Sequence, residues 1–169
     1  MKNDPKSPVL SPSDYRWLLR EMWLGCDGRW FLNVAERYGY EAANELNMAV
    51  GRSLTRASMR KLAKVAGWGP PEDVDALKGM FETGYEVYHP PPECEVEFQV
   101  LDERSLLALF HKCPVMEKVE RGGGMENYQC ACPLSFEGWM EALGLEGQAQ
   151  IEQGPEQRPP CRVVITVVW

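Results

Sequence analysis

The sequence predicts an α+β fold in which an N-terminal helical bundle packs on an antiparallel sheet. Apolar residues recur at helical spacing through the first half, an alternating pattern begins at Cys94, and a long apolar run covers 161–169. The proline tract at 89–92 separates the two halves. Because the elements after it follow the order ββααββ, we expect helices on one face of the sheet. Regions 1–88 and 93–169 are expected to form one cooperative unit.

Four helices are predicted in the first half. The first begins at Ser11, where a Ser-Pro-Ser-Asp run precedes the first apolar residues. A second is expected over 27–39, with the aspartate as its N-cap and the final glycine as its stop. The third spans about 41–66 and the fourth about 74–82, and both carry apolar residues on one face.

The second half alternates strands and helices. Residues 94–101 alternate between apolar and polar side chains, which is typical of a half-buried strand. Residues 105–112 are expected to be its hairpin partner, although the run LLALF also suits a helix. Helices are predicted to begin at Pro114 and Pro133, because proline is favoured at the first helical position. A short strand over 147–153 and the apolar run at the end of the sequence complete the predicted sheet.

Composition limits the classes of function. The net charge of -7 at pH 7 and the pI near 5.0 argue against nucleic acid or an anionic membrane as the main partner. The sequence lacks an apolar segment of signal-peptide or membrane-spanning length, so a cytoplasmic protein is expected. Its six cysteines are then expected to be reduced thiols, metal ligands or core residues rather than disulfides.

The stretch 111–133 is the candidate functional site. Cys113 and Cys132 each precede a proline, so each is expected at a helix start, where the helix dipole favours a thiolate. Thiolate and imidazole ligands suit zinc, and four thiolates also suit an iron–sulfur cluster. Buried free thiols and redox or nucleophilic chemistry are the alternatives. Cys26 and Cys94 lie on apolar faces and are expected in the core. The predicted metal ligands are Cys113, Cys130, Cys132, Cys161 and His111.

Two further groups stand out in the helical half. Aromatic residues crowd the first two predicted helices, where they either fill the core or line an apolar pocket. In the second case the ligand-binding residues would be Trp23, Asp27, Trp30 and Phe31. Basic residues recur every four positions along the third helix, which favours a solvated face, with an anion- or partner-binding surface as the alternative. This basic series is Arg52, Arg56, Arg60 and Lys64.

The sequence resembles a family of short uncharacterised prokaryotic proteins. Residues 27–42 carry its pattern D-G-x-W-F…E-x-x-G-x-E-x-A, and Cys113, Tyr128 with Cys130, and Cys161 follow in the family's order. More distantly, the ββααββ half is similar to vinyl-four-reductase-type domains and to aminothiazoline-carboxylate hydrolases. The first of these likenesses implies a small-molecule-binding module with a cysteine cluster for zinc, and both imply a ligand cavity between helices and sheet.

Three functions follow from these observations. The first is a cytoplasmic small-molecule-binding protein with a zinc or iron–sulfur cysteine site beside an apolar cavity. The second is a hydrolase in which a metal-bound water, or a thiolate of Cys113 or Cys132, attacks a cyclic amidine or amide. The third is an assembly partner without chemistry of its own, acting through the basic series. A small-molecule ligand is the expected partner, and a homodimer is left open.

Overall fold

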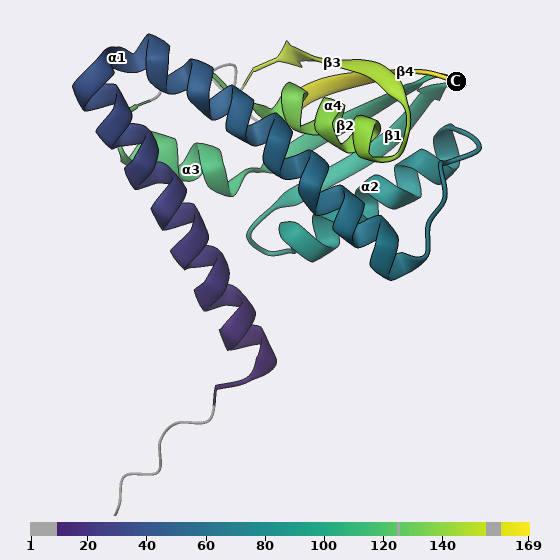
Figure 1. Cartoon of the computed structure of the whole chain (residues 1–169), viewed down its shortest axis with the longest axis horizontal. Helices are drawn as coiled ribbons and strands as arrows, with labels where there is room; N and C mark the ends of the chain where they lie inside the picture. Colours follow the sequence, from purple (N-terminus) through teal and green to yellow (C-terminus); the bar gives the residue numbers. More distant parts are fainter. Residues whose placement is uncertain (1–9, 125, 155–159) are drawn as a thin grey trace, which may run out of the picture.

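The computed structural model describes residues 10–124, 126–154 and 160–169. It confirms the predicted α+β class and the ββααββ order of the second half (Figure 1). The sheet has the strand order β1-β2-β4-β3, and all neighbouring strands are antiparallel. The elements are α1 (Pro12–Ala66), α2 (Val74–Tyr88), β1 (Glu95–Asp102), β2 (Ser105–Lys112), α3 (Pro114–Arg121), α4 (Cys132–Ala142), β3 (Glu146–Gln153) and β4 (Cys161–Val168).

Helix α1 begins with a capping box and bends once. The Ser11 backbone N–H donates to Asp14 Oδ2 at 2.8 Å, and the Asp14 N–H donates to Ser11 Oγ at 3.2 Å. Gly39 has φ 87° and ψ 161°, which is outside the helical region and accessible to glycine. The bend separates a first arm, residues 12–38, from a second arm, residues 40–66 (Figure 1).

The predicted helix start at Asp27 is wrong, because Asp27 lies inside the first arm. A mid-helix glycine such as Gly28 costs only about 1 kcal/mol relative to alanine. Leu24 and Phe31, one turn on either side, are buried and hold the helix across this position. The break expected at Gly39 is where the bend occurs.

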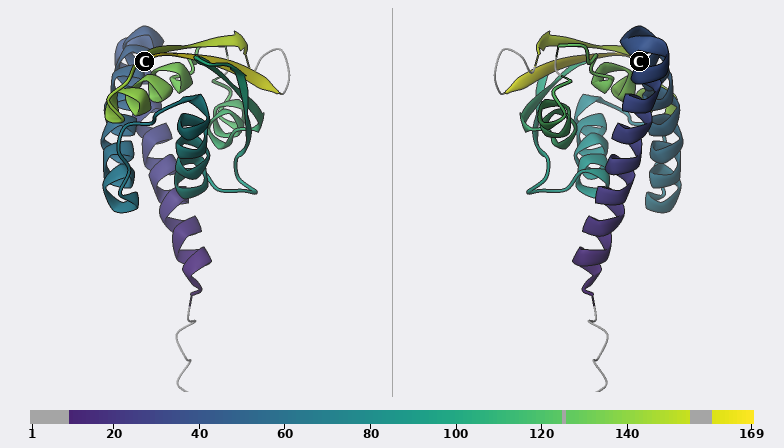
Figure 2. Two further views of the ribbon diagram at one scale, coloured as in Figure 1. Left: turned by 90° about the vertical axis from the view of Figure 1, so that its right-hand side faces the viewer. Right: turned by 90° about the vertical axis from the view of Figure 1, so that its left-hand side faces the viewer.

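Helices α2 and α4 pack on one face of the sheet, and the second arm of α1 lies across α4 (Figure 2). Close approach is possible because Gly138 of α4 has no side chain: a Cβ there would lie 2.5 Å from the Arg52 carbonyl oxygen. The core between these layers is aromatic and aliphatic, with Phe81 in ring contact with Phe98, Phe136 and Trp139. Its most completely buried members include Met59, Leu77, Phe81, Leu106, Phe136, Met140, Val163 and Ile165.

The hairpin β1–β2 places β2 in the interior of the sheet. Residues 106–110 of β2 are all buried, and the strand lies between β1 and β4. The helical alternative for LLALF is therefore wrong. Helix α2 runs to Tyr88, six residues further than predicted, because Tyr85 and Tyr88 pack against the core. Strands β1 and β3 form the two edges of the sheet.

Candidate functional site

A cavity of about 160 Å³ lies between the two arms of α1 and the body of the protein. The first arm contributes Trp23 and Asp27, and the second arm contributes apolar residues that include Val50 and Leu54. Its deeper wall comes from α2, the sheet, α4 and the segment before α4. Four cysteines line this cavity: Cys94, Cys113, Cys130 and Cys132.

The helix starts bring the predicted cysteines close together. Cys113 is the N-cap of α3, and Cys132 is the first residue of α4. The Cys132 and Cys130 thiols are hydrogen-bonded to each other, and Cys161, at the start of β4, is near enough to influence the Cys132 thiol electrostatically. The structure therefore gathers the four cysteines that the sequence singled out, Cys113, Cys130, Cys132 and Cys161.

The surroundings of Cys94, Cys113 and Cys132 raise the pKa of each of these thiols. Desolvation raises the pKa of Cys113, although hydrogen bonds from the backbone N–H groups of Met116 and Val115 act in the opposite direction. The pKa of Cys132 is well above its usual value, because of its hydrogen bond to Cys130 and its burial. Burial also raises the pKa of Cys94 to about 12. The expectation of thiolates at the two helix starts is therefore wrong.

The described residues give no support to the predicted zinc or iron–sulfur site. Within residues 10–124, 126–154 and 160–169, no group of three or more His, Cys, Asp or Glu side chains is arranged to hold a metal ion. His111 is exposed, with its Nε2 3.7 Å from Glu97 Oε2, and it does not line the cysteine cavity. Metal binding requires deprotonated thiols, and desolvation opposes that here.

The predicted ligand-binding residues divide between two environments. Trp23 and Asp27 line the cavity, and the Trp23 ring lies 6.1 Å from the His89 ring. Phe31 is buried in a small separate cluster, where its ring lies 5.4 Å from that of Tyr128. Trp30 is 44% exposed and does not line the cavity. These four residues therefore do not form one pocket.

A buried asparagine that sequence analysis missed holds the segment before α4. Asn44, only 3% exposed, donates from Nδ2 to the Asn127 carbonyl at 2.7 Å and accepts from the Gln129 N–H at 2.9 Å. An asparagine in a helical pattern usually faces solvent, so the sequence carried no signal for this role. These two hydrogen bonds hold the backbone next to Cys130, which lines the cavity.

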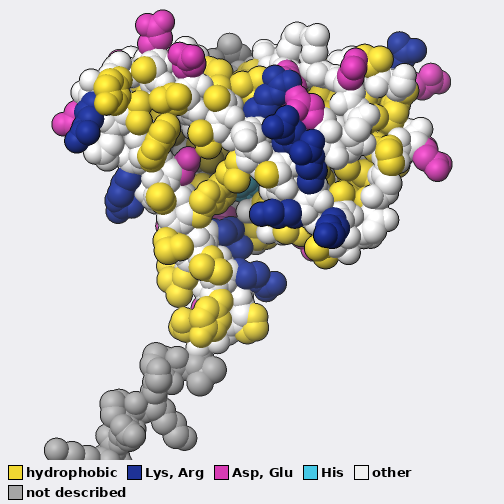
Figure 3. All heavy atoms as spheres, viewed as in Figure 1, with side chains coloured by type: hydrophobic (Ala, Val, Ile, Leu, Met, Phe, Trp, Pro, Cys, Tyr) yellow, Lys and Arg dark blue, Asp and Glu magenta, His cyan; other side chains and the backbone are white. Residues whose placement is uncertain are grey.

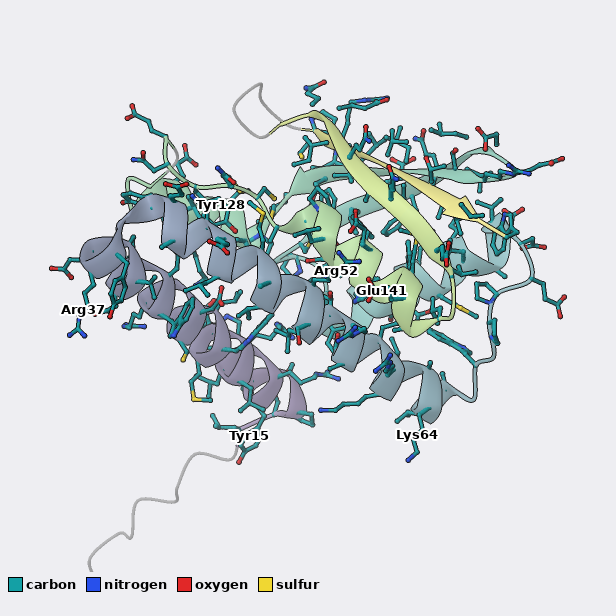
Figure 4. The ribbon with its side chains drawn as sticks, turned by 45° about the horizontal axis from the view of Figure 1, so that its top comes forward. Tyr15, Arg37, Arg52, Lys64, Tyr128 and Glu141 are labelled. Carbon is teal, nitrogen blue, oxygen red and sulfur yellow. The ribbon has the colours of Figure 1, made fainter. Side chains whose placement is uncertain are left out.

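The basic series is not a solvated face along its whole length. Arg52 donates from Nε to Glu141 Oε1 at 2.8 Å, and these two side chains lie together in Figure 4. Arg56 Nη1 lies 3.3 Å from Glu141 Oε2. Arg52 also pairs with Glu137, at 3.5 Å. The first two members therefore join α1 to α4, whereas Arg60 and Lys64 are exposed.

The first arm of α1 carries a row of exposed apolar side chains on the side away from the body. We call this row the outward stripe. Met22 is 68% exposed and Leu19 61%, although both would be buried in a closed bundle. Cys26, predicted to lie in the core, is exposed on the same row, whereas Cys94 is buried as predicted. Figure 3 shows apolar side chains over much of this arm. The outward stripe consists of Tyr15, Leu19, Met22, Cys26 and Trp30.

One signal in the sequence could have identified the outward stripe. Apolar residues surround the first arm on all sides: Leu24 and Phe31 face the body, while Leu19 and Met22 face away from it. A helix that is apolar all round is normally covered on every side. No helix in the described part of the chain is long and apolar enough to cross a membrane.

Comparison with known proteins gives a structural neighbour and no sequence relative. No protein-family model matches the chain, and no curated protein does. The fold is similar to that of a crystal structure described as a trafficking protein particle complex subunit 3 from Naegleria fowleri covalently bound to palmitic acid. The TM-score is 0.66 at 9% sequence identity, and the match covers 90% of this chain and 96% of the other.

The neighbour and the absence of a metal-binding group in the described residues overturn the first predicted function. A small-molecule-binding protein built around a zinc or iron–sulfur site is not what this fold and these cysteines indicate. The expected small-molecule partner is wrong for the same reasons. The neighbour is itself described as a subunit of a protein complex.

Proposed function

We propose that the chain is a subunit of a protein assembly and that it contacts another protein through the outward stripe. The observation that carries this proposal is the exposure of Leu19, Met22 and Tyr15, at 61%, 68% and 57%, on one side of a single helix. Contiguous apolar surface of this kind on a protein marks an interaction site. The basic series, which the sequence suggested for this role, is partly engaged within the molecule.

The spacing and composition of the stripe suit a helical partner. Successive members are four, three, four and four residues apart, so they follow one face of the first arm. Such i, i+3 and i+4 anchors are how an apolar helix face meets a partner helix or groove. Tyrosine, tryptophan and methionine are also the residues enriched at the centres of protein interfaces. Tyr15, at the start of the arm, is labelled in Figure 4.

The description of the structural neighbour supports an assembly role, but it also names a bound lipid that we do not propose for this chain. Its description names both a complex and a covalently bound palmitic acid. In this chain, burial raises the pKa of Cys113 and of Cys94, which line the cavity, and a protonated thiol is a poor nucleophile. A protein contact, and not a covalently held lipid, is therefore what we propose. A cytoplasmic location is part of the same proposal.

The test is a comparison of two variants of the full chain, each tagged and expressed in its native cells. Leu19→Gln with Met22→Gln places two amides in the stripe, whereas Val65→Gln changes an 86% exposed residue on the other arm. We expect stoichiometric co-purifying protein with wild type and Val65→Gln and its loss from the stripe variant, with equal melting temperatures. Retention by the stripe variant, or a wild-type chain that purifies alone, would contradict the proposal.

A further inference from the structure

Asp27 occupies an unusual position on the inner side of the first arm. It lines the cysteine cavity and also a smaller cavity, of about 80 Å³, between the first arm and α3. The smaller cavity is walled mainly by apolar side chains such as Leu24, Phe31 and Val119. The Asp27 carboxylate is therefore the acidic group that both spaces share. Figure 3 shows the hollow between the arms, bordered by apolar side chains.

Within residues 10–124, 126–154 and 160–169, the Asp27 carboxylate forms no ion pair. Burial raises its pKa, and no charge or hydrogen bond acts against that effect. By contrast, Arg20 lowers the pKa of Glu93, and Arg52 lowers the pKa of Glu141. A carboxylate left half-buried without a partner is costly to the folded chain. Such a group is expected where a ligand or partner supplies the missing charge.

The cations nearest to this region are already engaged. Lys118, which lines the smaller cavity, lies 3.0 Å from Glu21. Arg20 donates from Nε and Nη2 to the two Glu93 oxygens at 2.8 and 2.7 Å. His89 lines the larger cavity as a neutral ring, because burial and Arg20 lower its pKa to about 4. None of these three groups pairs with Asp27, so within the described residues the carboxylate is open to a cation from a partner.

Three other polar side chains of the larger cavity hydrogen-bond within the molecule, whereas the buried Trp139 Nε1, a donor, has no partner among the described residues. Asn47 donates to the Tyr128 hydroxyl at 3.5 Å, and the Thr55 hydroxyl donates to the Gly51 carbonyl at 2.8 Å. The Ser135 hydroxyl donates to the Ala131 carbonyl at 3.1 Å. Asp27, by contrast, is a carboxylate in this lining that makes no hydrogen bond or ion pair within the described residues.

We infer that the cavity between the arms receives a lysine or arginine side chain from the partner protein. The aliphatic stem would lie against Val50, Leu54 and the Trp23 ring, and the charged end would pair with Asp27. Trp23 adds attraction for a cation through its aromatic face. This inference rests on the proposed function, since it names a chemical feature of the same kind of partner. It gives the partner an ionic contact on the inner side of the first arm, in addition to the apolar contact on the outer side at the outward stripe.

The test uses two small probes of nearly equal size that stand for the side chain. n-Hexylammonium carries the charge, and 1-hexanol is its neutral counterpart; both are titrated into the full chain and followed by NMR. We expect n-hexylammonium to bind at least about tenfold more tightly than 1-hexanol, because hydrogen bonds to charged groups are the stronger ones. Asp27→Asn should remove this preference. Glu36→Gln, at an exposed carboxylate on the same arm, should keep it.

A second measurement needs no variant. The Asp27 carboxyl pKa, followed by NMR in the wild type, should fall when n-hexylammonium is added and stay unchanged with 1-hexanol. Equal affinity for the two probes, saturable binding of neither, or an unchanged Asp27 pKa would overturn the inference. Each of these outcomes is separate from the loss of co-purifying protein in the stripe variant, which tests the proposed function.

Discussion

At the scale of single residues, burial decides which groups carry charge. Cys113 stands at a helix start that favours a thiolate, yet desolvation outweighs the two backbone hydrogen bonds and raises its pKa. His89 shows the same effect for a base: its ring contacts those of Trp23 and Tyr85, and its pKa falls to about 4. Residue type and position in a helix therefore do not predict the charge of these groups without the packing around them.

The first prediction concerns His89 and acid stability. Its pKa is about 4 in the folded chain and about 6.5 unfolded, so the unfolded chain takes up a proton first as pH falls. We expect the free energy of unfolding to decrease between about pH 6.5 and pH 4, by up to about 3 kcal/mol. Arg20 disfavours the protonated ring and Glu93 favours it. Urea denaturation at pH 7.5 and pH 5 measures the loss.

Two variants identify the residue responsible. His89→Gln should flatten this pH dependence, whereas His111→Gln, at an exposed ring, should leave it as in wild type. An unchanged slope in His89→Gln would show that other groups control stability in this pH range.

At the scale of elements, the strands and most helix starts could be predicted, because they depend on local patterns. The alternation at β1 and the Cys-Pro starts of α3 and α4 are examples. The continuity of α1 through Asp27 could not, because it depends on Leu24 and Phe31 being buried by other elements. The sequence could predict that several cysteines lie near one another. It could not predict that their thiol pKa values are raised, because that depends on burial by distant segments.

The second prediction concerns the bend of α1. Gly39→Ala should destabilise the fold by roughly 1–3 kcal/mol, because φ 87° with ψ 161° is a region that other residues avoid. Thermal unfolding followed by circular dichroism measures this. Gly28→Ala is the matched change, since Gly28 is helical with no atom within 4 Å of an added Cβ. It should raise stability by up to about 1 kcal/mol. Equal effects of both changes would contradict the role assigned to the bend.

At the scale of the whole molecule, helices and sheet share one core. Met59 from α1 and Phe81 from α2 belong to the same cluster as Phe136, Val163 and Ile165. The outward stripe is outside that cluster, and a sequence alone cannot tell a face covered by its own chain from one covered by another. That distinction explains why the closed bundle was expected and why the exposed arm was not.

The third prediction is that the region 93–169 does not fold alone. Without α1 and α2, the face of the sheet that packs on Leu77 and Phe81 would be uncovered. We expect this fragment to be insoluble or molten, with poor dispersion in NMR spectra. A monomeric fragment with dispersed spectra and a cooperative melting transition would show instead that the two regions are independent domains.

The two sheet edges bear on solubility. Glu95 and Glu97 lie on β1, and Glu146 and Glu152 lie on β3, so both unpaired edges carry negative charge at neutral pH. When two molecules meet edge to edge, these carboxylates repel, and charged edges are a known protection against strand pairing between chains. The sequence pI is near 5.0, so the net negative charge of the chain falls as pH falls toward that value, while acid also weakens the fold through His89. Aggregation into intermolecular sheet is therefore expected to begin in acid, where both protections are lost together.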